Sequence, residues 1–366
     1  MNPAHAFNVQ DLRAAARRRL PRMAFDYLDG GAEDDLTRDA NRSALDRIRL
    51  VPRALVDVSR RSQRVSIFGH WHDSPFGIAP TGAAGIYWHR AEIALARAAL
   101  AMRVPFVLST HSFVPLAEVT RASGGAPWLQ LYIDPERPVT EALLDAAAQS
   151  GCTVLVLTVD APTGGNREYN YRNGFTIPVR LTRRTVIDGL RHPGWLARVY
   201  ARGLRRRRLS EWTTPHAHAS WSDFAWLRRR WPHRLVVKGV LSVEDAQLAA
   251  AHGADGVWIS NHGGRQLDGA PASIDALPPV VDAVGRRLTV MVDSGFRRGG
   301  DIVKALALGA DMVFVGRPAL YGVSAAGEAG VIRALDLLRN EVDRVLALLG
   351  CSSVAELGRQ HLRFTG

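Results

Sequence analysis

The sequence has few features of a secreted or membrane-spanning protein. Only two cysteines occur among 366 residues, Cys152 and Cys351, and neither has other metal-binding residues at ligand spacing. We therefore expect no disulfide framework, no metal site and a reducing compartment, the cytoplasm. Residues 1–19 contain no apolar core followed by a cleavage site, so we expect no signal peptide. No window of eighteen uncharged apolar residues is present, so we expect no membrane-spanning helix.

The composition that remains is typical of a globular α/β protein. Apolar residues make up 47% of the chain, which is enough for a large core. The length would allow two domains, but a single α/β barrel commonly reaches about 250 residues or more. We therefore predict one domain over residues 1–366. The formal net charge of +12 predicts an anionic partner.

Short apolar runs alternate with helical patterns along most of the chain. Strands are predicted at 76–79, 104–109, 127–133, 153–158, 234–238, 256–260, 289–292 and 312–315. Helices are predicted at 90–101, 115–122, 139–149, 222–231, 242–252, 278–285 and 300–308. Eight strands that alternate with helices favour a (β/α)8 TIM barrel over a doubly wound open sheet. The open sheet is further disfavoured because no Gly-x-Gly-x-x-Gly follows the first strand.

Additional elements surround the expected barrel. Helices are predicted at 8–20, 34–45 and 327–348, the last closed by Gly350, and residues 64–72 predict a hairpin at one end of the barrel. Ser222 and Ser242 resemble N-caps, and Asp301 is expected to open a helix after two glycines. The fourth and fifth strands start about eighty residues apart, far beyond the usual βα spacing. Residues 161–221 are therefore predicted to be an insertion at the catalytic face.

One stretch, Ser260-Asn261-His262-Gly263-Gly264-Arg265-Gln266, directly follows the sixth predicted strand. Parallel α/β proteins carry their chemistry at the carboxyl ends of strands. A histidine can accept a proton near neutral pH, and an arginine fork fits a carboxylate. The stretch therefore predicts a site that binds an acid and removes a proton from it. The alternative interpretation is a polar turn after a core strand.

Every other predicted strand also ends in polar or glycine residues. These are Pro80, Thr81 and Gly82; Ser109; Gln130 and Tyr132; Thr158, Asp160 and nearby Arg167; Lys238; Asp293, Gly295 and Arg297; and Gly316 and Arg317. The ends of strands seven and eight are a common phosphate site in barrels, because loop N–H groups and a helix N-terminus meet there. The alternative for Gln130 and Thr158 is that they satisfy buried backbone groups.

The seven-residue stretch resembles the active-site signature of the FMN-dependent α-hydroxy acid dehydrogenases and oxidases. The resemblance extends from about Leu12 to Leu362 and includes Asp-Tyr at 26–27 followed by Gly-Gly-Ala-Glu-Asp at 30–34. It implies FMN as the cofactor, with the phosphate near Gly295, Arg297, Gly316 and Arg317. Other residues implied to contact FMN are Pro80, Thr81, Gly82, Ser109, Gln130, Thr158, Lys238, Ser260 and Asp293.

The resemblance also implies the chemistry. We expect neutral His262 to take the hydroxyl proton of a 2-hydroxy acid while Asp160 orients the imidazole. Arg265 and Arg167 are expected to bind the substrate carboxylate with help from Tyr27. Tyr132 is expected to contact the oxygen that becomes the keto group. The sequence does not distinguish hydride transfer from a carbanion mechanism.

The substrate and electron acceptor are less closely defined. Members that resemble glycolate oxidase usually have alanine where this chain has Gly82, whereas membrane-linked lactate and mandelate dehydrogenases have glycine. We therefore expect a dehydrogenase that passes electrons to a membrane quinone or another acceptor, with a soluble, peroxide-forming oxidase as the alternative. Mandelate-like and lactate-like acids both remain possible. His111, where glycolate oxidase has tryptophan, leaves the substrate pocket in doubt. The family also implies a homotetramer.

The segment Arg180–Arg208 contains ten arginines and one acidic residue, a net charge of +9. Leu190, Trp195, Leu196, Val199, Tyr200 and Leu204 are interleaved with the arginines. Basic amphipathic segments with tryptophan bind membrane surfaces, so we expect peripheral association with the inner face of the cell membrane. The alternatives are a solvated loop or a nucleic-acid surface. We expect no nucleic-acid partner, because the segment adjoins the catalytic face. A barrel without catalytic activity, which would only bind a membrane or nucleic acid through this segment, is disfavoured because His262 and Arg265 are present.

Overall fold

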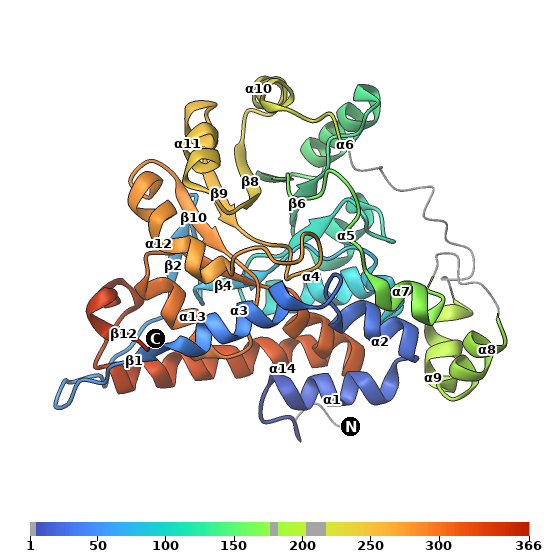
Figure 1. Ribbon diagram of the computed structural model, residues 1–366, viewed down its shortest axis with the longest axis horizontal. Coiled ribbons are helices and arrows are strands. Elements are labelled where there is room, and N and C mark those ends of the chain that lie inside the picture. Colours follow the sequence, from blue (N-terminus) through green and yellow to red (C-terminus); the bar gives the residue numbers. More distant parts are fainter. Residues whose placement is uncertain (1–4, 176–181, 203–216, 366) are drawn as a thin grey trace.

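A computed structural model describes residues 5–175, 182–202 and 217–365. Its centre is a sheet of eight parallel strands in the order β4-β11-β10-β9-β8-β7-β6-β5. A parallel bridge between Ile78 and Phe106 joins the two ends of this order and closes a barrel (Figure 1). The strands are β4 Phe76–Ile78, β5 Val107–Ser109, β6 Trp128–Leu131, β7 Val154–Thr158, β8 Arg234–Val240, β9 Gly256–Ile259, β10 Thr289–Val292 and β11 Met312–Val315. The predicted (β/α)8 barrel and all eight of its strands are confirmed.

Along each barrel strand, successive side chains point alternately into the barrel and toward the surrounding helices, as the twofold strand period requires. The molecule therefore has an inner and an outer apolar core. In β9, Trp258 lies inside the barrel with Phe314 of β11, while Val257 and Ile259 face the surrounding helices. The ring centroids of Trp258 and Phe314 are 4.0 Å apart. The barrel is therefore filled by aromatic and branched side chains and is not a channel.

The predicted hairpin is present as β2 Val65–Ile67 and β3 His70–His72, which pair antiparallel. Phe68 at its turn packs against Trp128, with ring centroids 5.8 Å apart. The hairpin thus closes the amino-terminal end of the barrel, opposite the strand ends predicted to carry the site.

Helices cover the outside of the barrel (Figure 1). They are α1 Val9–Arg19, α2 Arg22–Asp29, α3 Leu36–Arg47, α4 Ala91–Ala101, α5 Leu116–Ser123, α6 Arg137–Gln149, α10 Trp221–Arg230, α11 Val243–Ala251, α12 Ser273–Val284, α13 Gly299–Ala307 and α14 Arg317–Leu349. Short 3₁₀ turns occur at η2 Ala84–Ile86, η6 Val354–Glu356 and η7 Arg359–His361, and β1 Ile48–Leu50 pairs with β12 Leu362–Phe364. The sequence did not predict α2, which lies between α1 and α3.

Two helices start earlier than predicted. Helix α12 begins at Ser273 and continues through Pro278 and Pro279, where the sequence had placed its start. The Ser273 N–H donates to Asn41 Oδ1 and its hydroxyl accepts from the Asn261 N–H, which stabilises the first turn despite the prolines. Helix α14 begins at Arg317 and bends near Gly327, whose φ is 62°, so the predicted helix 327–348 is only its second half.

Two helix starts also needed correction. Ser220, and not Ser222, precedes α10, and the Ser220 N–H donates to Asp223. Helix α13 begins at Gly299, while Asp301 lies in its first turn and accepts from the N–H groups of Arg297 and Arg298. Ser242 caps α11 and Gly350 ends α14 in the left-handed conformation, as predicted.

The insertion after β7 contains the described helices α7 Glu168–Asn173, α8 Arg183–Leu190 and α9 Pro193–Trp195, followed by a π-helical turn, η3, at Leu196–Tyr200. These elements gather on one side of the molecule beside α2 (Figure 1). Residues 176–181 and 203–216 of the insertion lie outside the described residues, and so do the predictions for Arg180, Leu204 and Arg205–Arg208.

Candidate active site

The predicted site residues meet in one cavity of about 540 Å³ at the carboxyl end of the barrel. Those that line it are Tyr27, Pro80, Thr81, Gly82, Ser109, Gln130, Tyr132, Thr158, Arg167, Lys238, His262, Arg265, Asp293, Gly295, Arg297, Gly316 and Arg317. Asp160 and Ser260 lie behind this wall. The convergence follows from the parallel barrel, which brings all its strand ends to one mouth.

Asp160 orients the ring of His262. Its Oδ1 lies 3.0 Å from Nδ1 of the imidazole. This leaves Nε2 as the ring nitrogen that can exchange a proton with a bound molecule. Burial would raise the pKa of Asp160, but His262 and then Lys238 outweigh burial, so the pKa lies below its usual value. Asp160 therefore remains an anion that can stabilise a protonated imidazole.

The backbone at His262 is unusual. His262, Gly263 and Gly264 have φ values of 58°, 69° and 72°, so three consecutive residues are left-handed. The two glycines adopt this conformation at little cost, but His262 does not. Hydrogen bonds stabilise the turn: the His262 N–H donates to Ser260, and the Gly263 N–H donates to Ser294. The strained residue is thus the one that carries the candidate base.

Ser260 supports the Lys238 side chain and the backbone of His262, and it does not line the cavity. Its hydroxyl is 2.8 Å from the Lys238 ammonium and also accepts the His262 N–H. Asp293 lies 3.2 Å from the same ammonium. Lys238 is thereby held as a buried cation at the base of the cavity, with Trp258 beneath it.

Arg265 and Arg167 provide positive charge near His262. Within the part of the chain that the structure describes, no carboxylate forms an ion pair with either guanidinium. Arg265 instead donates to the carbonyl oxygens of Tyr27 and Gly30, at 2.7 and 2.9 Å. Burial, and then repulsion from Arg167, lowers the pKa of Arg265. Both effects favour the binding of an anion between the two arginines.

A second pair of arginines lies at the ends of β10 and β11. Arg317 is held by the carbonyl oxygens of Leu28, Gly30 and Gly263 at 2.9–3.2 Å. Burial, followed by repulsion from Arg297 and Arg265, lowers the pKa of Arg317 to about 9. Arg297 is half-buried, and burial lowers its pKa. Their position beside Gly295 and Gly316 fits a phosphate group.

Three buried polar atoms on the cavity wall have no hydrogen-bond partner among the described residues. They are Thr81 Oγ1, Gln130 Nε2 and Thr158 Oγ1. Gln130 Oε1, by contrast, accepts from Ser109 at 2.9 Å. Buried polar atoms seldom lack partners. These atoms, with Lys238, therefore match a flat heteroaromatic ring that has donors and acceptors on its edge.

The cavity wall also contains Tyr87, which the sequence did not assign to the site, and His111, which the sequence had linked to the substrate pocket only through its difference from glycolate oxidase. Tyr87 and His111 both line the cavity, and the His111 ring stacks on Tyr132 with centroids 5.0 Å apart. Burial, and then the negative charge of Asp160, raises the pKa of Tyr132. A Cβ added to Gly82 would lie 3.0 Å from the His111 Cβ. The link of His111 to the substrate pocket therefore agrees with its position, whereas the sequence offered no signal for Tyr87.

The helix that the sequence missed has a direct role in this geometry. The C-terminal turn of α2 supplies the carbonyl oxygens that hold Arg265 and Arg317. A helix C-terminus carries partial negative charge, which favours cations beside it. The same turn places the Tyr27 ring 4.9 Å from the Arg265 guanidinium carbon.

The basic segment is only partly amphipathic. Trp195 and Val199 are buried, and the indole N–H of Trp195 donates to the carbonyl of Ile86. Trp195 and Val199, which the sequence grouped with the apolar side chains of a membrane-binding segment, thus pack this segment onto the barrel. Among the described residues of the segment, the exposed large apolar side chains are Val186, Ile187 and Leu190, of which the sequence had named Leu190. Within the described residues, no helix has the length and apolar character needed to cross a membrane.

Comparisons with known proteins agree with this geometry. The model of the FMN-dependent dehydrogenase family matches residues 16–364. The chain is 42% identical to (S)-mandelate dehydrogenase of Pseudomonas putida, over 98% of this chain and 94% of the relative. It is 43% identical to L-lactate dehydrogenase of Caulobacter sp. (strain K31), over 98% of both. A solved structure described as the monotopic membrane protein (S)-mandelate dehydrogenase matches with a TM-score of 0.94 and 41% identity, over 99% of this chain and 100% of that one.

Proposed function

This chain belongs to the FMN-dependent dehydrogenase family, and on that premise we propose that it oxidises an L-2-hydroxy acid to the 2-keto acid. The observation that carries the proposal is the position of the His262–Asp160 pair beside two arginines, Arg265 and Arg167, that have no described carboxylate partner. The His262–Asp160 pair can take a proton, and the two arginines can bind a carboxylate. A 2-hydroxy acid carries both groups on adjacent carbons.

The cavity fits FMN, which supplies a two-electron acceptor when it is bound. Arg297 and Arg317, with the turns at Gly295 and Gly316, would hold its phosphate. Lys238, Gln130, Thr158 and Ser109 would contact the edge of its ring, and Pro80, Thr81 and Gly82 would lie along it. The unpartnered buried atoms of Thr81, Gln130 and Thr158 support this assignment. Asp293 and Ser260 would act by fixing Lys238.

Each group of protein residues would have a different role toward the substrate. Arg265 and Arg167 bind the carboxylate and fix the orientation of the adjacent carbon, and the Tyr27 ring centroid lies 4.9 and 6.0 Å from their guanidinium carbons. Nε2 of His262 takes the hydroxyl proton while Asp160 stabilises the imidazolium that forms. The Tyr132 hydroxyl, which burial keeps protonated, donates to the oxygen that becomes the keto group.

We propose that the substrate side chain lies beside Gly82, Tyr87 and His111. The absent methyl group at Gly82 leaves room for it. Both mandelate-like and lactate-like acids fit the similarity to the two dehydrogenases. Gly82 also favours a dehydrogenase over an oxidase, so a quinone or a similar carrier is the proposed electron acceptor.

We propose that the protein associates peripherally with the inner face of the cell membrane. The described part of the insertion supports this, because exposed Ile187 and Leu190 lie among Arg183, Arg184 and Arg191. Similarity to a monotopic membrane protein supports it as well. We further propose that residues 1–366 act as one FMN-binding domain and that four copies form a tetramer.

Anaerobic reduction of the purified yellow protein tests the proposed function. We expect one or more L-2-hydroxy acids from a panel with aryl and short alkyl side chains to bleach the flavin absorbance. The reduced protein should react slowly with oxygen and rapidly with a quinone analogue. Absence of bleaching by the whole panel would refute the proposed activity, and rapid peroxide formation would favour an oxidase.

A further inference from the structure

Asp35 occupies the position of an N-cap but does not act as one. It directly precedes α3, yet its side chain makes no capping hydrogen bond to that helix. The cap is provided by Asp268, which accepts from the backbone N–H groups of Leu36 and Thr37 at 3.2 and 2.8 Å. Asp35 is 3% exposed and has a left-handed φ of 66°. Asp35 is thus a buried carboxylate on a strained backbone, and Asp268 takes its capping role. This indicates that Asp35 has a function other than helix capping.

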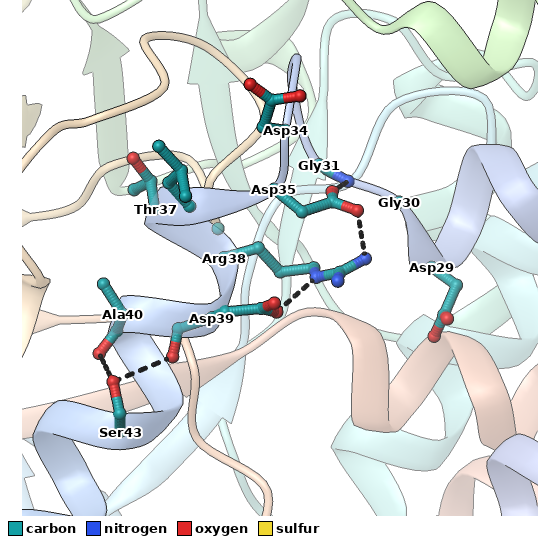
Figure 2. Close-up of polar contacts among 12 residues, drawn as sticks. Asp29, Gly30, Gly31, Asp34, Asp35, Thr37, Arg38, Asp39, Ala40 and Ser43 are labelled. Atoms are coloured by element: carbon teal, nitrogen blue, oxygen red, sulfur yellow. Dashed lines mark hydrogen bonds and ion pairs between the residues drawn. The ribbon is translucent and has the colours of Figure 1, made fainter.

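The carboxylate of Asp35 points at the turn that follows α2. Its Oδ1 accepts the Gly31 N–H at 2.6 Å, and its Oδ2 lies 2.8 Å from the Arg38 guanidinium (Figure 2). Gly31 has no room for a side chain, because an added Cβ would lie 2.6 Å from Asp35 Oδ1 and 2.6 Å from the carbonyl oxygen of Gly264. The turn is therefore clamped between Asp35 and the loop that carries His262.

The Gly31 N–H and the Gly30 carbonyl are the two ends of one rigid peptide group. The Gly30 oxygen accepts from both Arg265 and Arg317, each at 2.9 Å. A single peptide group thus has a buried carboxylate at one end and two buried guanidinium groups at the other. The carboxylate fixes the plane of the peptide and polarises it, so the oxygen becomes a better acceptor. It does so without pairing directly with either arginine, whose charge stays available to ligands.

The insertion after β7 contacts the same carboxylate. The Tyr169 hydroxyl of α7 donates to Asp35 Oδ2 at 2.6 Å. The Tyr169 ring also packs on Gly30, where an added Cβ would lie 2.9 Å from it. The position of the insertion is therefore coupled to the peptide group that orients the two arginines.

We infer that Asp35 is a positioning residue which, through the Gly30–Gly31 peptide group and with Tyr169, orients Arg265 toward the substrate carboxylate and Arg317 toward the FMN phosphate. This inference rests on the roles proposed above for the two arginines. It assigns a function to a residue outside the cavity wall and explains why a buried acid lies behind a site that binds anions.

The test compares Asp35→Asn with the matched control Asp39→Asn in the FMN-loaded protein. Asp39 pairs with the same Arg38, lies four residues further along α3 and does not contact the turn. Two non-oxidisable probes, phenylacetate and its neutral amide, are titrated through the change in flavin absorbance. Equilibrium dialysis measures the dissociation constant of FMN.

For Asp35→Asn we expect phenylacetate to bind about tenfold more weakly and FMN to dissociate more readily, because a charged hydrogen bond behind both arginines is lost. Amide binding should remain unchanged, and Asp39→Asn should match the unaltered protein in all three measurements. With a substrate that reduces the flavin, KM should rise more than kcat falls.

Equal weakening of acid and amide, or no weakening of either, would overturn the inference. If Asp35→Asn yields no folded protein, Tyr169→Phe is measured instead. In that variant a roughly threefold loss restricted to phenylacetate would support the inference, and unchanged phenylacetate binding would overturn it. Failure of the proposed function is seen separately, as the absence of flavin reduction in the unaltered protein.

Discussion

Nδ1 of His262 lies 3.0 Å from Oδ1 of Asp160, although 102 residues separate them in the chain. His262 follows β9 and Asp160 follows β7, two strands that flank β8 in the barrel. Gly239, at the bulge of β8 between Lys238 and Val240, packs against Asp160, since an added Cβ would lie 2.6 Å from the Cβ of Asp160. The barrel thus sets the distance and direction of the pair before any ligand binds.

Replacing His262 with glutamine should remove the proton acceptor while keeping the size and polarity of the side chain. Flavin reduction by the best hydroxy acid should slow by about 10²–10⁴-fold, the usual contribution of a general base. The FMN content should not change, because the proposed phosphate and ring contacts come from other residues. Anaerobic stopped-flow absorbance measures the rate. A near-normal rate would exclude His262 as the base.

Replacing Asp160 with asparagine should alter the dependence of stability on pH. The depressed pKa of Asp160 means that its stabilising effect is present above its unfolded pKa of about 3.9 and is lost as the pH falls through the folded value. The difference in the free energy of unfolding between wild type and variant should decrease as the pH falls below about 4, because wild type then loses the stabilisation that His262 and Lys238 give the carboxylate. Urea unfolding at several pH values measures it. A difference that stays the same between about pH 5 and pH 2 would contradict this assignment.

Replacing Gly82 with alanine should narrow the part of the cavity in which the side chain of the substrate is proposed to lie. The new methyl group would lie 3.0 Å from the Cβ of His111, so the His111–Tyr132 stack must shift. Reduction by an aryl hydroxy acid should slow by about tenfold, with a smaller effect for lactate. Comparison of kcat/KM for the two acids provides the test. An equal effect on the aryl acid and on lactate would show that the side chain of the substrate does not lie beside Gly82.

Replacing Arg297 with methionine should weaken FMN binding by about tenfold or more, because a half-buried cation at the proposed phosphate site is lost. Arg298→Met is the matched control, since Arg298 is exposed and pairs with Glu341. Equilibrium dialysis of FMN against both variants measures the difference. If the two variants retain FMN equally, the phosphate does not bind at Arg297.

Replacing Leu190 with aspartate should reduce sedimentation with anionic liposomes, because the change removes an exposed apolar contact and adds a repelled charge. Leu348→Asp is the control, because Leu348 is also exposed but lies near the end of α14, outside the insertion. Binding of the unaltered protein should fall as salt is raised. Equal loss in both variants would argue against the insertion as the membrane contact.

Sequence reasoning located the barrel strands well, because buried parallel strands are continuous apolar runs that are easy to recognise. It failed for α2, whose Arg22 and Asp26 interrupt the apolar pattern, although Tyr27 within it was correctly placed at the cavity. It also did not show that Trp195, an apolar residue among arginines, packs onto the barrel. In both cases tertiary packing decided the outcome.

The amino-acid sequence was enough to predict the fold class and the chemical groups of the site, because strand ends in a parallel barrel must converge and their polar residues can be identified along the chain. How those groups are held could be seen only in three dimensions. The shared carbonyl of Gly30, the carboxylate of Asp35 behind it and the contact from Tyr169 join segments far apart in the chain. Such contacts require distant segments to be placed relative to one another within a few tenths of an ångström, and no local pattern of residues specifies that placement.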